Sequence, residues 1–294
     1  MTYSIVARGG RDGFEELGVA VQSHWFGVGS IVPWARAGVG AVATQANAEV
    51  AYGPRALDLL AQGVPAPKAL QRLLAEDPLA HSRQVAIIDA HGQVAAHTGP
   101  ACMAFAGDVQ GEGVSCQANI MATAEVWPAM LQAYTAGEGS LTTRLLTALN
   151  VGEATGGDLR GRQSAAILVV PAAGEAWETV TALRVEDHPD PLVELARLVR
   201  LSEAYRLAGQ GDERLAQGHH AQAAALFARA CEIAPESDEL RFWAGLGAAQ
   251  EGDMETALAH VRAAIAVHGG WLELLRRLPA ELAPSAPAVL AALD

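Results

Sequence analysis

Thr2 is the residue whose type and position most directly suggest chemistry in this sequence. Threonine is small enough for an aminopeptidase to remove Met1, which leaves a free α-amine on a residue that carries a hydroxyl. Such an amine accepts the hydroxyl proton itself, so the nucleophile needs no distant base. Because an α-amine titrates at about 7.7–8.0, it is close to working pH without burial. We therefore expect Thr2 to be a nucleophile. Ser4, on the same face of an expected strand, is expected to support the amine or to act as a second nucleophile.

Other polar side chains stand where apolar runs end. Ser23 and His24 follow the second run, Thr44 and Gln45 follow the third, and His97 closes a later one. Polar groups beside a buried strand are either exposed or hydrogen-bonded into a site. We expect these strand ends to form a shared substrate-binding cleft. For His97, a structural role within the fold is the competing interpretation.

A glycine-rich loop before the apolar run 165–170 gathers a further set of polar groups. It brings together a carboxylate, a guanidinium, an amide and a hydroxyl, namely Asp158, Arg160, Gln163 and Ser164. We expect Asp158 and Arg160 to belong to the catalytic set and Gln163 and Ser164 to bind substrate. A solvated turn is the alternative for this loop.

Several familiar sites are excluded. No Gly-x-Ser-x-Gly elbow occurs, and no Gly-Lys-Ser/Thr follows the glycine pairs near residues 27–40. The nine histidines show no metal-ligand spacing. We therefore expect no metal and no cofactor.

Composition limits the partners and the compartment. The formal net charge of −13 argues against a nucleic-acid or anionic-membrane surface. No apolar run is long enough to span a membrane, and the first 30 residues do not resemble a signal peptide. The three cysteines form no CxxC and are odd in number. These features predict a cytoplasmic, reduced protein.

The first part of the chain reads as α+β. Short apolar runs alternate with glycine-rich turns, with helical segments in the middle and strands again at the end. The expected strands are 2–7, 17–23, 38–44, 85–89, 93–97, 164–170 and 179–185, with a hairpin turn at 9–13. The expected helices are 54–62, 66–76, 123–136 and 141–152. Runs that are apolar on both faces indicate sheets covered on both sides by other layers.

The second part reads as purely helical from residue 192 to about residue 278, after a proline-rich linker at 186–191. Gly218 and Gly252 are 34 residues apart, which is the tetratricopeptide (TPR) period. Ala223 matches Ala257 at the same offset, but Gly269 stands where the second copy should have proline. We expect domains at 1–185 and 192–294, the second being TPR-like and leaning on the first domain or on another subunit.

Many segments in collinear order resemble one bacterial and archaeal family, the domain of unknown function 1028. The resemblance covers residues 2 to about 200 and rests on 2–7, 17–23, 32–35, 37–45, 52–54, 83–85, Asp89, 97–99, Asn119, 157–164 and 187–191. That family is grouped with the N-terminal nucleophile hydrolases. The resemblance therefore implies a four-layer αββα sandwich and amide hydrolysis through an acyl-enzyme on Thr2.

The resemblance leaves three points open. The proteasome-like branch of the superfamily places a lysine near the nucleophile, whereas here the single lysine, Lys68, lies in an expected helix. A required cation would come from Arg36, Arg83 or Arg160, with Arg160 beside Asp158 as first choice. Asn119 is the expected oxyanion donor. The substrate is expected to be a small amide or peptide.

Two other functional hypotheses stay open. One is a non-catalytic sandwich whose TPR-like helices dock a protein partner. The other is an assembly protein, since relatives of the sandwich form rings and stacks; a homo-oligomer is expected.

Overall fold

The computed structural model describes residues 2–11 and 13–293, so the expected removal of Met1 lies outside the described residues. The chain divides into two compact units, Met1–Arg197 and Leu198–Asp294. The boundary falls inside helix α5 (Pro191–Ala216), which begins where the expected linker ends. Each unit is described by itself.

The described part of the first unit contains two antiparallel sheets. Sheet A has the strand order β10-β9-β2-β1-β8-β7, and sheet B has the order β3-β4-β5-β6. Sheet A consists of β1 (Thr2–Arg11), β2 (Phe14–Ser23), β7 (Gly107–Gly111), β8 (Val114–Asn119), β9 (Ser164–Pro171) and β10 (Thr181–Val185). Sheet B consists of β3 (Pro33–Arg36), β4 (Gly40–Ala46), β5 (Arg83–Asp89) and β6 (Val94–Thr98). Thr2 therefore begins a central strand, between β2 and β8.

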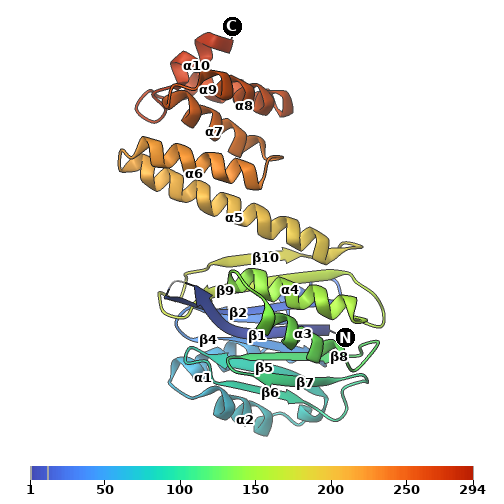
Figure 1. Ribbon diagram of the computed structural model, residues 1–294. Coiled ribbons are helices and arrows are strands. Elements are labelled where there is room, and N and C mark those ends of the chain that lie inside the picture. Colours follow the sequence, from blue (N-terminus) through green and yellow to red (C-terminus); the bar gives the residue numbers. More distant parts are fainter. Residues whose placement is uncertain (1, 12, 294) are drawn as a thin grey trace. The chain divides into compact units, whose positions relative to one another are not determined.

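Helices cover the face of each sheet that points away from the other sheet (Figure 1). Helices α1 (Tyr52–Ala61) and α2 (Ala66–Glu76) pack on sheet B. Helices α3 (Val126–Ala136) and α4 (Leu141–Ala154) pack on sheet A. Short 3₁₀ turns η1 (Val28–Ser30) and η2 (Ala80–Ser82) precede β3 and β5. The strands are apolar on both faces because both faces are covered.

The space between the sheets changes character along the strands. Aliphatic residues from both sheets fill most of it, including Val6, Val19, Ala43 and Ile88. Toward the start of β1, polar side chains replace them, beginning with the fully buried Ser4. Buried polar groups persist in a core only when they are hydrogen-bonded, so this end of the sandwich is built around a network.

The second unit is helical throughout its regular elements. Its helices are α6 (His220–Ile233), α7 (Asp238–Gln250), α8 (Met254–Val267), α9 (Gly270–Arg277) and α10 (Ala286–Leu293), after the C-terminal part of α5. Gly218 and Gly252, 34 residues apart, both adopt positive φ (77° and 87°) in the turns before α6 and α8. Ala223 and Ala257, at the same offset, are both buried. The repeat seen in the sequence thus recurs in turn geometry and in burial.

Some element predictions were wrong in detail. The expected turn at 9–13 is shorter, because β1 and β2 stay paired as far as Arg11 and Phe14. Strands β3 and β7 were not expected; each is short and lies at the edge of a sheet, where few side chains need to be apolar. Helical structure extends beyond residue 278, since α10 runs to Leu293.

Candidate functional site

A cavity of about 510 Å³ opens at the end of the sandwich where β1 begins. Thr2 lines it together with Ser23 at the end of β2, Gln45 near the end of β4 and Asn119 at the end of β8. In an antiparallel sheet the start of one strand lies beside the ends of its neighbours, so the pairing of β1 with β2 and β8 brings Thr2, Ser23 and Asn119 together. Gln45 reaches them from sheet B, which packs on sheet A. The remaining lining residues are Trp25, Val28, Ile31, Val32, Ala46, Asn47, Ala48, Val50, Ser82, Ala101, Cys102, Met103, Ile120 and Arg160.

The hydroxyl and carbonyl of Thr2 are both held by neighbouring side chains. Its Oγ1 lies 3.1 Å from the Oγ of Ser23. Its carbonyl oxygen accepts hydrogen bonds from Gln45 Nε2 at 3.4 Å and from Asn119 Nδ2 at 3.3 Å. These contacts fix the first residue of β1 from three directions, which is the rigid placement that a reacting hydroxyl requires.

Behind Thr2 lies a network of buried amides. Gln84 Oε1 accepts from Gln45 Nε2 at 2.7 Å and from Asn119 Nδ2 at 2.8 Å. Ser4 donates to Gln45 Oε1 at 2.7 Å and accepts from Gln117 Nε2 at 2.6 Å. Ser4 is fully buried and is absent from the cavity lining. Its hydroxyl therefore belongs to the support of the site, and this geometry does not favour it as a second nucleophile.

Arg160 reaches the cavity on a short loop that a buried carboxylate organises. Its Nε and Nη2 donate to Asp158 Oδ1 and Oδ2, at 3.2 and 3.0 Å. Asp158 also accepts from the backbone N–H of His24 at 3.0 Å, and its side chain is fully buried. Among the described residues that line the cavity, Arg160 carries the only formal charge. Arg36 pairs with Asp58 on the surface instead.

Ser164 supports the loop that enters the cavity after β2. Its hydroxyl accepts from the backbone N–H of Val28 at 3.1 Å and donates to the carbonyl oxygen of Trp25. Both loop residues line the cavity, whereas Ser164 does not. Ser164 therefore holds the backbone of Trp25 and Val28 in position and does not itself face the cavity.

Four other residues predicted to bind substrate do not line the cavity. Thr44 donates to the carbonyl of Glu49 at 3.0 Å, and His97 Nε2 lies 2.8 Å from the carbonyl of Ala80. Gln163 Nε2 donates to Asp187 Oδ1 at 3.1 Å, on the surface. The ring of His24 lies 3.3 Å from the carbonyl oxygen of Arg162. Thr44 and His97 thus join strands β4 and β6 to neighbouring segments, and Gln163 and His24 join loops to other loops.

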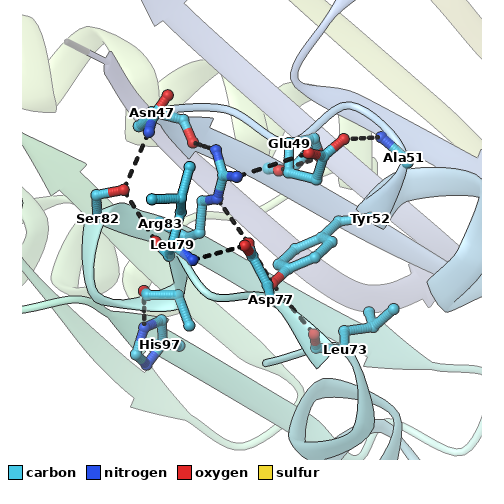
Figure 2. A network of polar contacts seen from close by, with 12 residues as sticks. Asn47, Glu49, Ala51, Tyr52, Leu73, Asp77, Leu79, Ser82, Arg83 and His97 are labelled. Carbon is cyan, nitrogen blue, oxygen red and sulfur yellow. Dashed lines mark hydrogen bonds and ion pairs between the residues drawn. The ribbon is translucent and has the colours of Figure 1, made fainter. Parts of the chain in front are cut away.

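The loop after β4 is held by a charged cluster around Arg83, shown in Figure 2. Arg83 Nε donates to Asp77 Oδ2 at 2.7 Å, and its Nη1 donates to the carbonyl of Asn47 at 2.6 Å. The Tyr52 hydroxyl also donates to Asp77, at 2.9 Å. The pKa of Asp77 is lowered to about 2, and the hydrogen bond from Arg83 is the largest cause. Arg83, one of the three expected cations, thus fixes the cavity wall from behind and does not line the cavity.

Sequence reasoning missed several lining groups. Asn47 lines the cavity, and its Nδ2 donates to Ser82 Oγ at 3.0 Å. Cys102 also lines the cavity, and burial raises the pKa of its thiol. Ala46 and Ile120 adopt positive φ, 66° and 55°, which costs L-residues about 1–2 kcal/mol each. Ordinary residue types in loops gave no signal for these positions.

Two kinds of feature are not found in the described ranges 2–11 and 13–293. There, no three His, Cys, Asp or Glu side chains converge as a metal-binding group. In the same ranges, no helix has both the length and the apolar character needed to cross a membrane.

The chain belongs to a family of unknown function, DUF1028, whose model matches residues 2–195. It is also similar to the crystal structure of protein SPO2555 from Silicibacter pomeroyi, attributed to the same family. The two are 28% identical with a TM-score of 0.60, and the match covers 67% of this chain and 84% of that one. No curated protein matches the chain. The match to the family spans every residue that lines the cavity.

Proposed function

We propose that this member of the DUF1028 family is an amidohydrolase whose nucleophile is Thr2, exposed as the N-terminal residue by removal of Met1. The substrate is a small amide or a peptide-like molecule. The observation that carries the proposal is the placement of the Thr2 hydroxyl in a cavity at the head of a central strand, 3.1 Å from the Ser23 hydroxyl.

The proposed fold type is the N-terminal nucleophile hydrolase sandwich. It is supported by two antiparallel sheets with helices on the outer face of each, and by a candidate nucleophile that begins a central strand. The helical unit is proposed to be TPR-like, on the strength of the 34-residue repeat that recurs in the turns before α6 and α8. Docking of a protein partner by these helices and homo-oligomer formation remain predictions.

The proposed reaction proceeds in two halves. The free α-amine of Thr2 accepts the hydroxyl proton, and Oγ1 attacks the substrate carbonyl carbon, whose π electrons move to oxygen. When the tetrahedral intermediate collapses, the C–N bond breaks and the leaving amine takes the proton from the α-ammonium. Water then attacks the Thr2 ester carbonyl with the amine as base. The acyl C–Oγ1 bond breaks, the carboxylic acid leaves, and the proton on the amine returns to Oγ1. We propose that Ser23, which contacts Oγ1, carries the proton between the amine and the hydroxyl.

The amides around Thr2 divide into supports and donors. Both N–H groups of Asn119 Nδ2 are used, one on the Thr2 carbonyl and one on Gln84. As an oxyanion donor Asn119 would have to release one of these contacts, so we assign it to holding Thr2 in place. Asn47 lines the cavity, and its Nδ2 donates to Ser82 with one of two N–H groups, so we propose the second N–H as the side-chain donor for the oxyanion.

The compartment is proposed to be the cytoplasm. The cysteines Cys102, Cys116 and Cys231 are all unpaired, as expected of a protein that functions under reducing conditions.

Two measurements test the function in order. Intact mass first shows whether the purified chain begins at Thr2. Thr2→Ala, which still permits removal of Met1, is then compared with wild type on a library of amides by mass spectrometry. We expect Thr2→Ala to lose at least about 10³-fold in kcat. Thr147→Ala is the matched control, because Thr147 is exposed on α4 and does not line the cavity. Retention of Met1, or full activity in Thr2→Ala, would refute the proposal and favour a binding or assembly protein.

A further inference from the structure

Large apolar side chains are exposed to solvent on residues that line the cavity or lie one or two positions from such a residue in the sequence. Their exposed fractions lie between 41% and 67%. We call this set the apolar collar; its members are Trp25, Phe26, Val50, Met103, Phe105 and Leu159. A soluble protein rarely leaves such side chains exposed together unless they contact something.

Backbone hydrogen bonds join the segments that carry Met103, Phe105 and Leu159. Ile120 donates to the carbonyl of Met103 at 3.0 Å, and Leu159 donates to the carbonyl of Ile120 at 3.1 Å. Met121 donates to the carbonyl of Phe105, also at 3.0 Å. The loop at 24–26 joins the same group of segments through the His24 contact with Asp158.

The collar also continues into the cavity. Trp25, Val50 and Met103 belong to the collar and line the cavity. Farther in, Val28, Ile31 and Val32 form an apolar wall between β2 and β3. The polar groups Thr2, Ser23, Gln45 and Asn119 stand at the strand ends. The cavity therefore joins a polar reaction centre to an apolar surface that leads out to solvent.

We propose that the substrate is an amide carrying an apolar chain of medium length, which lies along the aliphatic wall and the apolar collar while the amide bond meets Thr2. This inference rests on the proposed hydrolase and adds the substrate class to it. An acetamide-sized group would leave the wall and the collar without contact. A cavity of about 510 Å³ falls in the range typical of sites for molecules larger than that.

The test separates binding from hydrolysis. The probes are N-acylglycinamides with acyl chains of two, four, six and eight carbons, and N-alkylacetamides with alkyl chains of the same lengths. Their dissociation constants are measured by calorimetry on the full-length Thr2→Ala protein, below the concentration at which the probes aggregate. Burying one methylene group fully improves affinity about fourfold, so a half-exposed collar predicts about twofold per methylene. If affinity rises with chain length among the N-acylglycinamides, the substrate carries its chain on the acyl side of the amide. If it rises among the N-alkylacetamides, the chain is on the amine side.

Matched variants locate the contact. Trp25→Ala and Met103→Ala, each combined with Thr2→Ala, are expected to flatten the dependence on chain length. Phe14→Ala is the control, since Phe14 is 78% exposed but begins β2, about 30 Å along the strand from Ser23. If a collar variant fails to fold, Leu159→Ser replaces it.

Each outcome is decisive. Affinity that is independent of chain length in both series overturns the inference, as does a dependence that Trp25→Ala and Met103→Ala leave unchanged. Collar variants that turn an oligomer into monomers, with no change in probe affinity, overturn it in favour of contact between two copies of the chain. Chain-dependent binding without hydrolysis in wild type supports this inference and refutes the proposed hydrolase. Equal hydrolysis of probes of all chain lengths, without chain-dependent binding, supports the proposed hydrolase and overturns this inference.

Discussion

Asp77→Asn tests whether the charged cluster behind the cavity stabilises the fold as its geometry indicates. The Asp77 carboxylate accepts from Arg83 Nε, the Tyr52 hydroxyl and the backbone N–H of Leu79. The Arg83 and Asp77 side chains are only 7% and 11% exposed, so solvent screens the pair weakly. The variant leaves a buried guanidinium with the Asn47 carbonyl at 2.6 Å and Glu49 at 3.6 Å.

The expected size follows from the pKa. A shift of the Asp77 pKa from 3.8 to about 2 corresponds to about 2 kcal/mol of stabilisation at neutral pH. Because the pKa is lower in the folded state, this stabilisation is present above pH 4 and is lost as pH falls through 2. We expect Asp77→Asn to lower the free energy of unfolding by about 2–4 kcal/mol at pH 7. The difference from wild type should shrink by about 1 kcal/mol at pH 3.

The assay is urea unfolding of the full chain at pH 7, 5 and 3. Asp58→Asn is the matched control, because Asp58 also pairs with an arginine, Arg36, but is 61% exposed. A surface pair contributes about 0–1 kcal/mol. If Asp77→Asn costs no more than Asp58→Asn, or if its effect does not depend on pH, the ionised Asp77 carboxylate does not stabilise the fold.

Three further predictions concern the cavity and the packing around it. Ser23→Ala should lower kcat about 10²-fold or more with little change in KM, measured on the best amide found, because the Ser23 hydroxyl contacts the proposed nucleophile. A change confined to KM would argue against a role of Ser23 in proton transfer. Gly53→Ala should lower the free energy of unfolding by about 1–3 kcal/mol in urea, because a Cβ there would lie 2.3 Å from Trp34 Cγ; an unchanged midpoint would contradict this. Cys102 should react with iodoacetamide more slowly than free cysteine at pH 7.5, because burial raises the pKa of its thiol. The rate of alkylation, measured by peptide mass spectrometry, should still rise above pH 9. Rapid alkylation at neutral pH would contradict this, since it would show an accessible thiolate.

The parts of the site that could be predicted from sequence are those fixed by local topology. Strands β1 and β2 form a tight hairpin of two equal strands, so the start of one must lie beside the end of the other. The approach of Thr2 to Ser23 follows from that pairing. In the helical unit, burial follows the 34-residue period of the sequence, as for Ala223 and Ala257, which are both buried.

The parts that could not be predicted depend on contacts between distant segments. Gln45 reaches Thr2 only because sheet B packs on sheet A, and Arg83 meets Asn47 only because β5 lies beside β4. Nothing in a strand's own pattern specifies its partner across a sandwich. For the same reason Thr44, His97 and Gln163, which have the polarity expected of site residues, proved to hold loops together.

The amides at the site show why residue type alone does not assign a role. Asn119 and Asn47 carry the same side chain, and both line the cavity. The two N–H groups of Asn119 are already bonded to the Thr2 carbonyl and to Gln84, which is the reason for proposing that it supports Thr2. Asn47 lies in a loop, is solvent-exposed and donates once, to Ser82. An amide can stabilise a developing negative charge only through an N–H that is not already hydrogen-bonded in the folded protein. Which N–H groups are already bonded depends on the tertiary structure and not on the residue type.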